Sequence, residues 1–211
     1  MLERRGCIAA GRVADGCRTI TGQLAHHAEP PVASRTKGSS NVNHIVRRPS
    51  PSPPGERSIL GCSHFQVAYV TTDIEHARKV FSERYGIGAY QALEGPTPSG
   101  GYIRVALAWC GGLMYELVQT EGPGSEFYTE RLPKEGFAIR HHHLGYFVET
   151  PEAWRRLKAK VAAEDWPIAA DLHVQGQLSA LYIEAPELGH YLEFIFPERG
   201  GVEFFESVPV T

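Results

Sequence analysis

Two kinds of apolar and polar pattern alternate along the chain after about residue 60, and their order is repeated. Apolar residues at three-to-four spacing, typical of an amphipathic helix, follow Asp73 and Thr150, and both of these residues are good helix N-caps. One strand-like stretch precedes each helical stretch, and three more follow it, separated by turns that carry Gly and Pro. The pattern therefore predicts two βαβββ modules in tandem.

The predicted elements can be given by residue range. The helices begin at Ile74 and at Pro151, and proline suits the first helical position because no hydrogen bond is lost there. The strands are expected at 66–70, 89–93, 102–109 and 113–118 in the first module, and at 143–147, 168–174, 178–184 and 191–196 in the second.

The two modules indicate an internal duplication. Shifting the chain by 77 residues places residues 66–70 on 143–147 and Asp73 on Thr150. Strands, caps and helices all keep this register, as expected of a repeated structural unit.

Four polar residues keep the same register. Gln66 and Glu116 are 50 residues apart, and so are His143 and Glu193. Alternation along the last predicted strand puts Glu193 among buried neighbours. An isolated buried carboxylate there would cost several kcal/mol, roughly, unless it is paired or binds a metal. The spacing therefore predicts one metal ion held between the two modules.

The chemistry of these four side chains supports a metal site. An amide oxygen, an imidazole and two carboxylates form a ligand set without thiolate, which suits one divalent ion of Zn, Ni, Co, Mn or Fe. Such an ion polarises a carbonyl and makes a neighbouring C–H acidic. Glu193 or Glu116 is the expected proton shuttle. The predicted reaction is an isomerisation, an epimerisation or a lyase-type proton transfer.

Purely structural roles stay open for the same residues. His143 belongs to a triplet that could form an exposed start of a strand, and Gln66 could be satisfied by backbone groups. Glu116 and Glu193 could be salt-bridged strand residues. Four further residues are candidates for substrate binding: His142, Tyr102, Arg104 and Tyr182. Tyrosines at such positions are either core or pocket wall, and for Arg104 a solvated strand face is favoured over binding of an anionic substrate.

The chain from about residue 60 to 197 resembles the vicinal oxygen chelate superfamily, the group of glyoxalases, bleomycin-resistance proteins and extradiol dioxygenases. The resemblance is carried by Gln-Val-Ala-Tyr at 66–69, Tyr-Glu-Leu at 115–117, His-Leu-Gly-Tyr at 143–146 and Tyr-Leu-Glu-Phe at 191–194. It implies an α+β fold in which two βαβββ modules form a cup-shaped, mostly antiparallel sheet around one metal ion. It also implies a small-molecule substrate and a homodimer.

Departures from the family pattern narrow the expected activity. The ligand order is similar to that of lactoylglutathione lyases, but Val70 and Thr120 stand where glutathione-using members carry Arg and Asn. Gln66 stands where an extradiol dioxygenase has its first His. The connector 119–136 resembles that of methylmalonyl-CoA epimerases, which use His and Gln where this chain has Gln66 and Glu116. The alternative function is metal-free binding of a small molecule, as in bleomycin-resistance proteins.

Composition separates the first 57 residues from the rest. They are rich in Gly, Ser, Pro and Arg, so we expect a disordered tail, either a targeting segment or an upstream stretch added by a misplaced start codon. Nine Lys or Arg against four Asp or Glu give the tail a charge of +5, which leaves −8 for the remainder of a chain of net charge −3. An acidic folded part argues against nucleic-acid binding.

The predicted organisation is a tail at 1–57, a domain of the vicinal oxygen chelate type at 58–200, with modules at 60–120 and 138–197, and a C-terminal extension at 201–211. No apolar run is long enough to cross a membrane. The four cysteines form no CxxC pair, so we expect reduced thiols and a cytoplasmic protein.

Overall fold

The computed structural model describes residues 50–51 and 58–211. The predicted disordered tail falls almost wholly outside these residues and stays a prediction. In the part of the chain that the structure describes, no helix is long and apolar enough to cross a membrane.

Both predicted modules form, each in the order strand, helix, three strands. The first contains β1 (Ser63–Thr71), α1 (Ile74–Tyr85), β2 (Gln91–Pro96), β3 (Tyr102–Cys110) and β4 (Leu113–Glu121). The second contains β5 (Ile139–Phe147), α3 (Pro151–Ala163), β6 (Ile168–Val174), β7 (Leu178–Ala185) and β8 (His190–Pro197). A short 3-10 helix, η1 (Ile59–Gly61), precedes them, and α2 (Glu126–Thr129) connects them.

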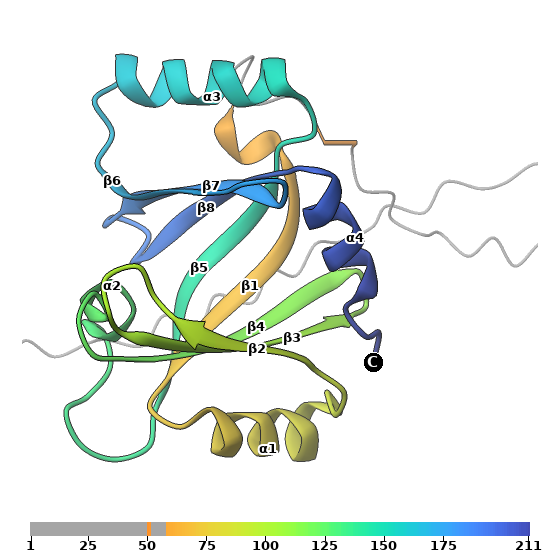
Figure 1. The fold of residues 1–211 in the computed structure, drawn as a ribbon, viewed down its shortest axis with the longest axis vertical. Coiled ribbons are helices and arrows are strands. Elements are labelled where there is room, and N and C mark those ends of the chain that lie inside the picture. Colours follow the sequence, from red (N-terminus) through yellow and green to blue (C-terminus); the bar gives the residue numbers. More distant parts are fainter. Residues whose placement is uncertain (1–49, 52–57) are drawn as a thin grey trace, which may run out of the picture. The chain divides into compact units, whose positions relative to one another are not determined.

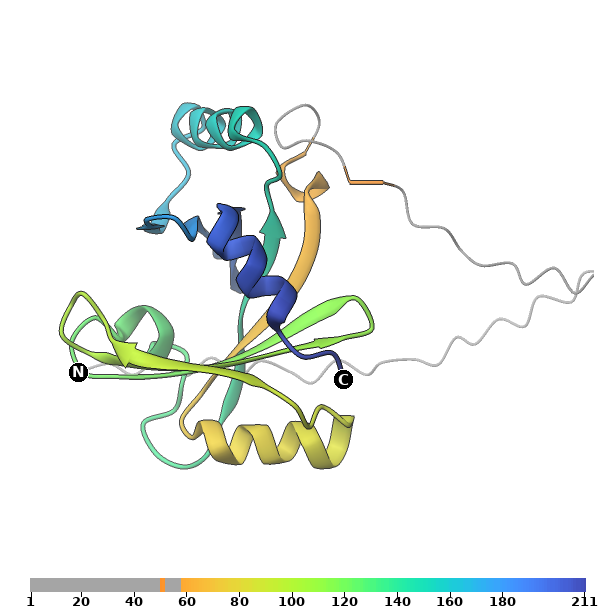
Figure 2. The same cartoon turned by 45° about the vertical axis from the view of Figure 1, so that its right-hand side comes forward.

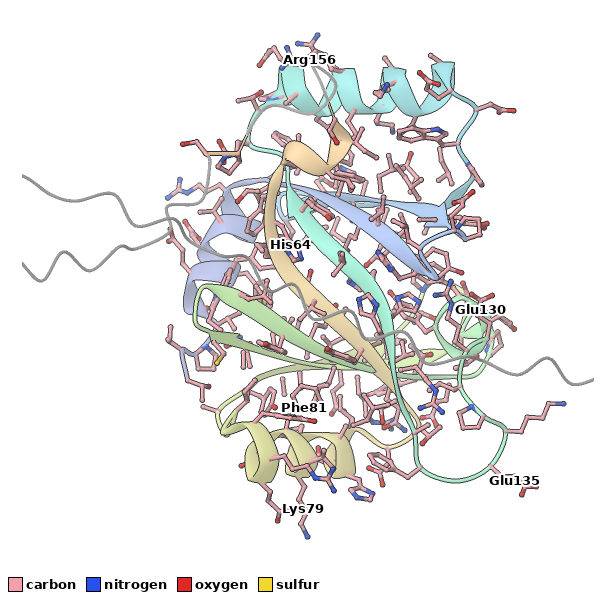
Figure 3. The ribbon with its side chains drawn as sticks, turned by 180° about the vertical axis from the view of Figure 1, so that it is seen from behind. His64, Lys79, Phe81, Glu130, Glu135 and Arg156 are labelled. Carbon is pink, nitrogen blue, oxygen red and sulfur yellow. The ribbon has the colours of Figure 1, made fainter. Side chains whose placement is uncertain are left out.

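The long helices begin at the predicted caps. The Asp73 side chain accepts a hydrogen bond from the His76 backbone N–H at 2.9 Å, and the Thr150 side chain accepts one from the Ala153 backbone N–H at 3.1 Å. Each helix then buries one apolar face against its own module. Figure 3 shows the result on α1, where Phe81 is directed to the sheet and Lys79 away from it.

All eight strands join one sheet in the order β2-β3-β4-β1-β5-β8-β7-β6. Strands β1 and β4 pair in parallel, as do β5 and β8, and the other pairs are antiparallel. The modules meet where β1 pairs with β5 (Figure 1). The predicted α+β class and the mostly antiparallel cup are therefore confirmed.

Three hydrophobic clusters hold this sheet. Two lie between a helix and the outer face of its module, under α1 and under α3. The third lies on the concave side and draws on both modules, with the buried residues Phe65, Leu107, Met114, Ala180, Tyr182, Tyr191, Ile195, Phe205 and Val208. The inside of the cup is thus a shared core that neither module could complete alone.

A helix that the sequence pattern did not predict, α4 (Arg199–Ser207), continues from β8 into the predicted C-terminal extension. Figure 2 shows it crossing the open side of the curled sheet. The Phe205 ring lies 5.7 Å from that of Phe65 and 5.2 Å from that of Phe147, measured between centroids. The Trp109 indole N–H donates to the Phe205 carbonyl at 3.0 Å. Helix α4 therefore ties the end of module two to β3 of module one.

Replacing Phe205 tests this tie. Phe205 is 8% exposed, so Phe205→Ala should lower the free energy of unfolding by about 3–5 kcal/mol through lost burial and an unfilled cavity. Val202→Ala, on the same helix but 42% exposed, is the control and should change it by about 0.5 kcal/mol. Urea denaturation measures both, and equal small losses would mean that α4 is not part of the core.

Candidate functional site

The four predicted ligands lie on the four central strands of the sheet, one on each. In the spatial order β4-β1-β5-β8, the strands carry Glu116, Gln66, His143 and Glu193. The β1–β5 pairing brings the two pairs together, because it places β4 and β8 on either side of the central two strands (Figure 1). Residues that are up to 127 positions apart, from 66 to 193, thus meet in one place.

The four side chains contact one another in a buried group, which we call the quartet. The Nε2 atom of His143 lies 3.1 Å from Oε2 of Glu116 and 3.1 Å from Oε2 of Glu193. The side-chain amide of Gln66 donates to Oε2 of Glu116 at 3.0 Å. His143 has a side-chain exposure of 1%, Glu193 of 6% and Glu116 of 14%, so Glu116 has the most contact with solvent among these three.

Two small residues form the floor under the quartet. Ala68 pairs with Glu116 on one side and His143 on the other, and Gly145 pairs with Gln66 on one side and Glu193 on the other. A Cβ atom at Gly145 would stand only 2.6 Å from Oε1 of Gln66 and 2.8 Å from its Cβ. Close approach of Gln66 therefore requires glycine at position 145.

An irregularity in β5 adds a second histidine to the site. The β1–β5 register shifts between the pairs Ala68 with His143 and Tyr69 with His141, so His142 has no partner on β1. Such a bulge re-aims side chains, and Nδ1 of His142 lies 2.9 Å from Nδ1 of His143. Burial, and then the charge of His143, lower the pKa of His142 to about 3, so His142 is neutral at physiological pH.

Burial and charge act in opposite directions on His143. Burial acts to lower its pKa, but the negative charges and hydrogen bonding of Glu193 and Glu116 outweigh burial and raise the pKa to about 9. Two carboxylates face one imidazole, so the formal charge of the group is negative even when the imidazole is protonated. A charge of this kind in a buried site favours a bound cation.

The donor set fits a divalent metal ion. Two ligands at right angles, each about 2.0–2.2 Å from an ion, are about 3 Å apart, close to both separations of 3.1 Å from His143 Nε2. That nitrogen and Oε1 of Gln66 are buried without a hydrogen-bond partner of good geometry among the described residues. An orphaned amide oxygen beside two carboxylates is matched by a cation, and the imidazole nitrogen joins this donor set once it has lost its proton.

The quartet is not arranged as a complete metal site. Within residues 50–51 and 58–211, no group of three or more His, Cys, Asp or Glu side chains has a geometry that could hold an ion. In the quartet, Gln66 presents its amide N–H, rather than its oxygen, to Glu116. Metal binding by all four residues therefore requires His143, Glu116 and Glu193 to rearrange as well as the Gln66 amide to turn over, which exchanges its nitrogen and oxygen positions.

Two of the four weaker predictions lie at the quartet. Tyr182 stands opposite Glu193 in the β7–β8 pair, and its ring centroid is 5.3 Å from that of His143. Burial, followed by the charge of Glu193, raises the pKa of Tyr182 well above its ordinary value, so its hydroxyl stays protonated. His142 lies behind His143, where it is fully buried.

The structure does not bring Tyr102 and Arg104 to the quartet. On β3 the concave side is taken by Leu107, which pairs with Glu116, whereas Ala106 packs in the cluster under α1. Side chains alternate along a strand, so the even-numbered Tyr102 and Arg104 lie on the outer face. Arg104 also forms ion pairs at 3.6 and 3.2 Å with acidic residues of β2 and β4.

Sequence reasoning missed three residues that shape the site. Gly145 had a signal, because the 77-residue shift superposes it on Ala68, and both are small. Phe127 and Tyr128 of α2 had none, since a four-residue helix has no apolar period. Their rings lie 4.8 and 5.0 Å from that of His142, so α2 covers this end of the quartet.

No protein-family model matches the sequence, and no curated protein matches it. Several solved structures match the fold. A methylmalonyl-CoA epimerase variant of Streptomyces coelicolor, in complex with 2-nitronate-propionyl-CoA, is 12% identical with a TM-score of 0.46, over 64% of this chain and 98% of that one. The epimerase of Mycobacterium tuberculosis is 16% identical with a TM-score of 0.45, over 67% and 91%. A hypothetical protein of Bacillus halodurans is 17% identical with a TM-score of 0.45, over 65% and 95%.

At these identities and TM-scores the matches say nothing about activity. The topology defines the class of fold independently: each module has the strand order 1-4-3-2, and the two modules join edge to edge into one curled sheet. This is the arrangement of two βαβββ modules in one cup-shaped sheet that the sequence resemblance implied.

Adding a methyl group at Gly145 tests the floor of the site. Gly145→Ala should destabilise the protein by about 1–3 kcal/mol, because the new Cβ overlaps the Gln66 side chain. Gly95→Ala is the matched control, since a Cβ there meets nothing within 4 Å. Urea denaturation compares the two variants, and a Gly145→Ala protein as stable as the control would refute the close approach.

Proposed function

We propose that the chain is a divalent-metal-dependent enzyme that moves a proton on a carbon next to a carbonyl of a small substrate, in an isomerase, epimerase or lyase reaction. The observation that carries this proposal is the buried quartet, in which one imidazole nitrogen faces two carboxylate oxygens at 3.1 Å each. Keeping like charges together in a buried place is costly, and such arrangements cluster at functional sites.

The residues that would hold the ion are Gln66, Glu116, His143 and Glu193. When bound, a divalent ion of Zn, Ni, Co, Mn or Fe supplies Lewis acidity, which polarises a substrate carbonyl and makes the neighbouring C–H more acidic. The homodimer and the cytoplasmic location stay predictions.

The two carboxylates differ in their surroundings, which supports different roles. Glu116 has a side-chain exposure of 14% and Glu193 of 6%, so Glu116 is better placed to meet a substrate. Glu193 stands opposite the protonated hydroxyl side chain of Tyr182. We assign Glu116 to take the proton from the substrate carbon and to return it, as a general base and then a general acid. Glu193 stays in place.

We assign the remainder of the substrate to a cavity of about 420 Å³ beyond the quartet, which is lined mostly by polar residues and by none of the four quartet residues. Its lining includes Thr120, Thr129 and Lys134. Thr120 lies four residues after Glu116 on β4, hence on the same face of the sheet, and its hydroxyl oxygen is buried without a partner among the described residues. A polar group of the substrate would bind this hydroxyl.

Metal analysis of the purified protein tests the proposed cofactor. The wild type should hold about one divalent ion per chain. Glu193→Gln should weaken the affinity for the ion by at least about 10–100-fold, because even the loss of a residue that only hydrogen-bonds a ligand costs that much. Glu184→Gln, a change of an exposed glutamate on β7, is the control and should bind as the wild type does. A wild type without stoichiometric metal would sink the proposal and favour metal-free binding.

Solvent-deuterium exchange tests the proposed proton transfer. Candidate substrates are α-hydroxyketones, 2-oxoaldehyde adducts and acyl-CoA esters, followed by NMR for deuterium at the carbon next to the carbonyl. Glu116→Gln should lose about 10²–10⁴-fold in exchange rate, because the amide cannot accept the proton. Exchange that survives unchanged in Glu116→Gln would show that another group is the base.

A further inference from the structure

His142 is a buried histidine that has no role as a ligand, base or acid in the proposed reaction. It is fully buried, and both of its ring nitrogens are engaged. Nε2 lies 3.0 Å from the backbone carbonyl oxygen of Phe127 in α2, and Nδ1 lies 2.9 Å from Nδ1 of His143. The rings of Tyr128 and Tyr191 lie 5.0 and 4.9 Å from it, so the ring cannot turn freely.

These two contacts determine where the hydrogen atoms lie. A carbonyl oxygen only accepts, so Nε2 of His142 carries a hydrogen and donates it to Phe127. In the neutral ring Nδ1 is then an acceptor, and the hydrogen in the contact between the two histidines belongs to Nδ1 of His143. His143 therefore donates through Nδ1, and its Nε2 is the atom that faces the two carboxylates.

We infer that His142 is a positioning residue that connects α2 to the candidate metal site by fixing the ring of His143. The inference rests on the proposed function, because it matters only where Nε2 of His143 is a ligand. Histidine ligands of metals usually donate their other N–H to a fixed partner, which sets the tautomer and the orientation of the ring. Here the partner is a second imidazole, itself held by a backbone carbonyl.

The connection extends to the segment between the two modules. The residue after α2, Glu130, accepts a hydrogen bond from the Tyr191 hydroxyl of β8 at 2.6 Å, and Figure 3 shows Glu130 at this turn. The Arg131 guanidinium lies 4.9 Å above the Tyr191 ring. A displacement of α2 would break the Phe127 contact and free His142, and with it the ring of His143.

Titration with Zn²⁺ tests the inference through affinity. His142→Leu removes both hydrogen bonds and should weaken Zn²⁺ binding by about 10–100-fold. His142→Asn keeps an acceptor near the position of Nδ1 and should lose less than His142→Leu. His141→Gln is the matched control: it changes the neighbouring histidine, which pairs with Tyr69 instead, and it should bind as the wild type does.

A second measurement does not depend on metal. In ¹H–¹⁵N spectra of metal-free wild type, the Nδ1–H proton of His143 should exchange slowly with solvent, and in His142→Leu it should exchange rapidly. The inference is overturned if that proton is unprotected in the wild type, or if His142→Leu binds Zn²⁺ as tightly as the control does. If the wild type shows slow exchange of that proton but binds no metal, the hydrogen bond between the two histidines exists. The positioning role and the proposed function would then both be refuted.

Discussion

The antiparallel pairing of β1 with β5 is the constraint on which the rest of the molecule depends. Each module alone ends in an unpaired β1 or β5 edge, and joining these edges makes a single sheet. The join places Glu116 and His143 on either side of Ala68, and Gln66 and Glu193 on either side of Gly145. A slip by one residue would turn every side chain of one module to the other face. Register therefore determines both the core and the quartet.

The same pairing of β1 with β5 buries charged groups, and apolar packing cannot compensate their charge. The pairing brings two carboxylates to 3.1 Å from one imidazole nitrogen inside the cup, where α2 covers one end of the quartet. The hydrogen bond from Gln66 to Glu116 compensates part of this charge. A net negative charge remains, and a cation is the simplest complement to it. The pairing of β1 with β5 therefore forms both the shared core and the charged quartet on which the proposed chemistry depends.

Much of this arrangement could be predicted from the sequence, because the duplication repeats every signal twice. The helix starts, the succession of strand, helix and three strands along each module, and the four quartet residues all followed from the 77-residue register. Helix α2 was missed because it is four residues long and Ser125 provides no side-chain cap. Helix α4 was missed because Gly200 and Gly201 lie inside it, and glycine disfavours helix. Helix α2 is too short to show an apolar period. The α4 segment does show one, because Gly201, Phe205 and Val208 recur at helical spacing and are buried, but its two glycines weigh against a helix.

The misplaced predictions have a comparable cause. Arg104 was considered for its charge, but the face of β3 on which it lies depends on pairing with β4, which the residue pattern alone did not determine. Strict alternation would also have put His142 on the opposite face from His143, whereas a bulge in β5 brings both rings together. Local irregularities of this kind are set by neighbouring strands.

The most direct measurement of the central claim is anomalous diffraction from crystals of the protein grown with Zn²⁺. One ion is expected at about 2.0–2.2 Å from Nε2 of His143 and from a carboxylate oxygen of Glu116 and of Glu193. The Gln66 amide is expected to have turned its oxygen toward the ion. Zinc bound elsewhere, or a quartet unchanged at saturating Zn²⁺, would contradict the claim.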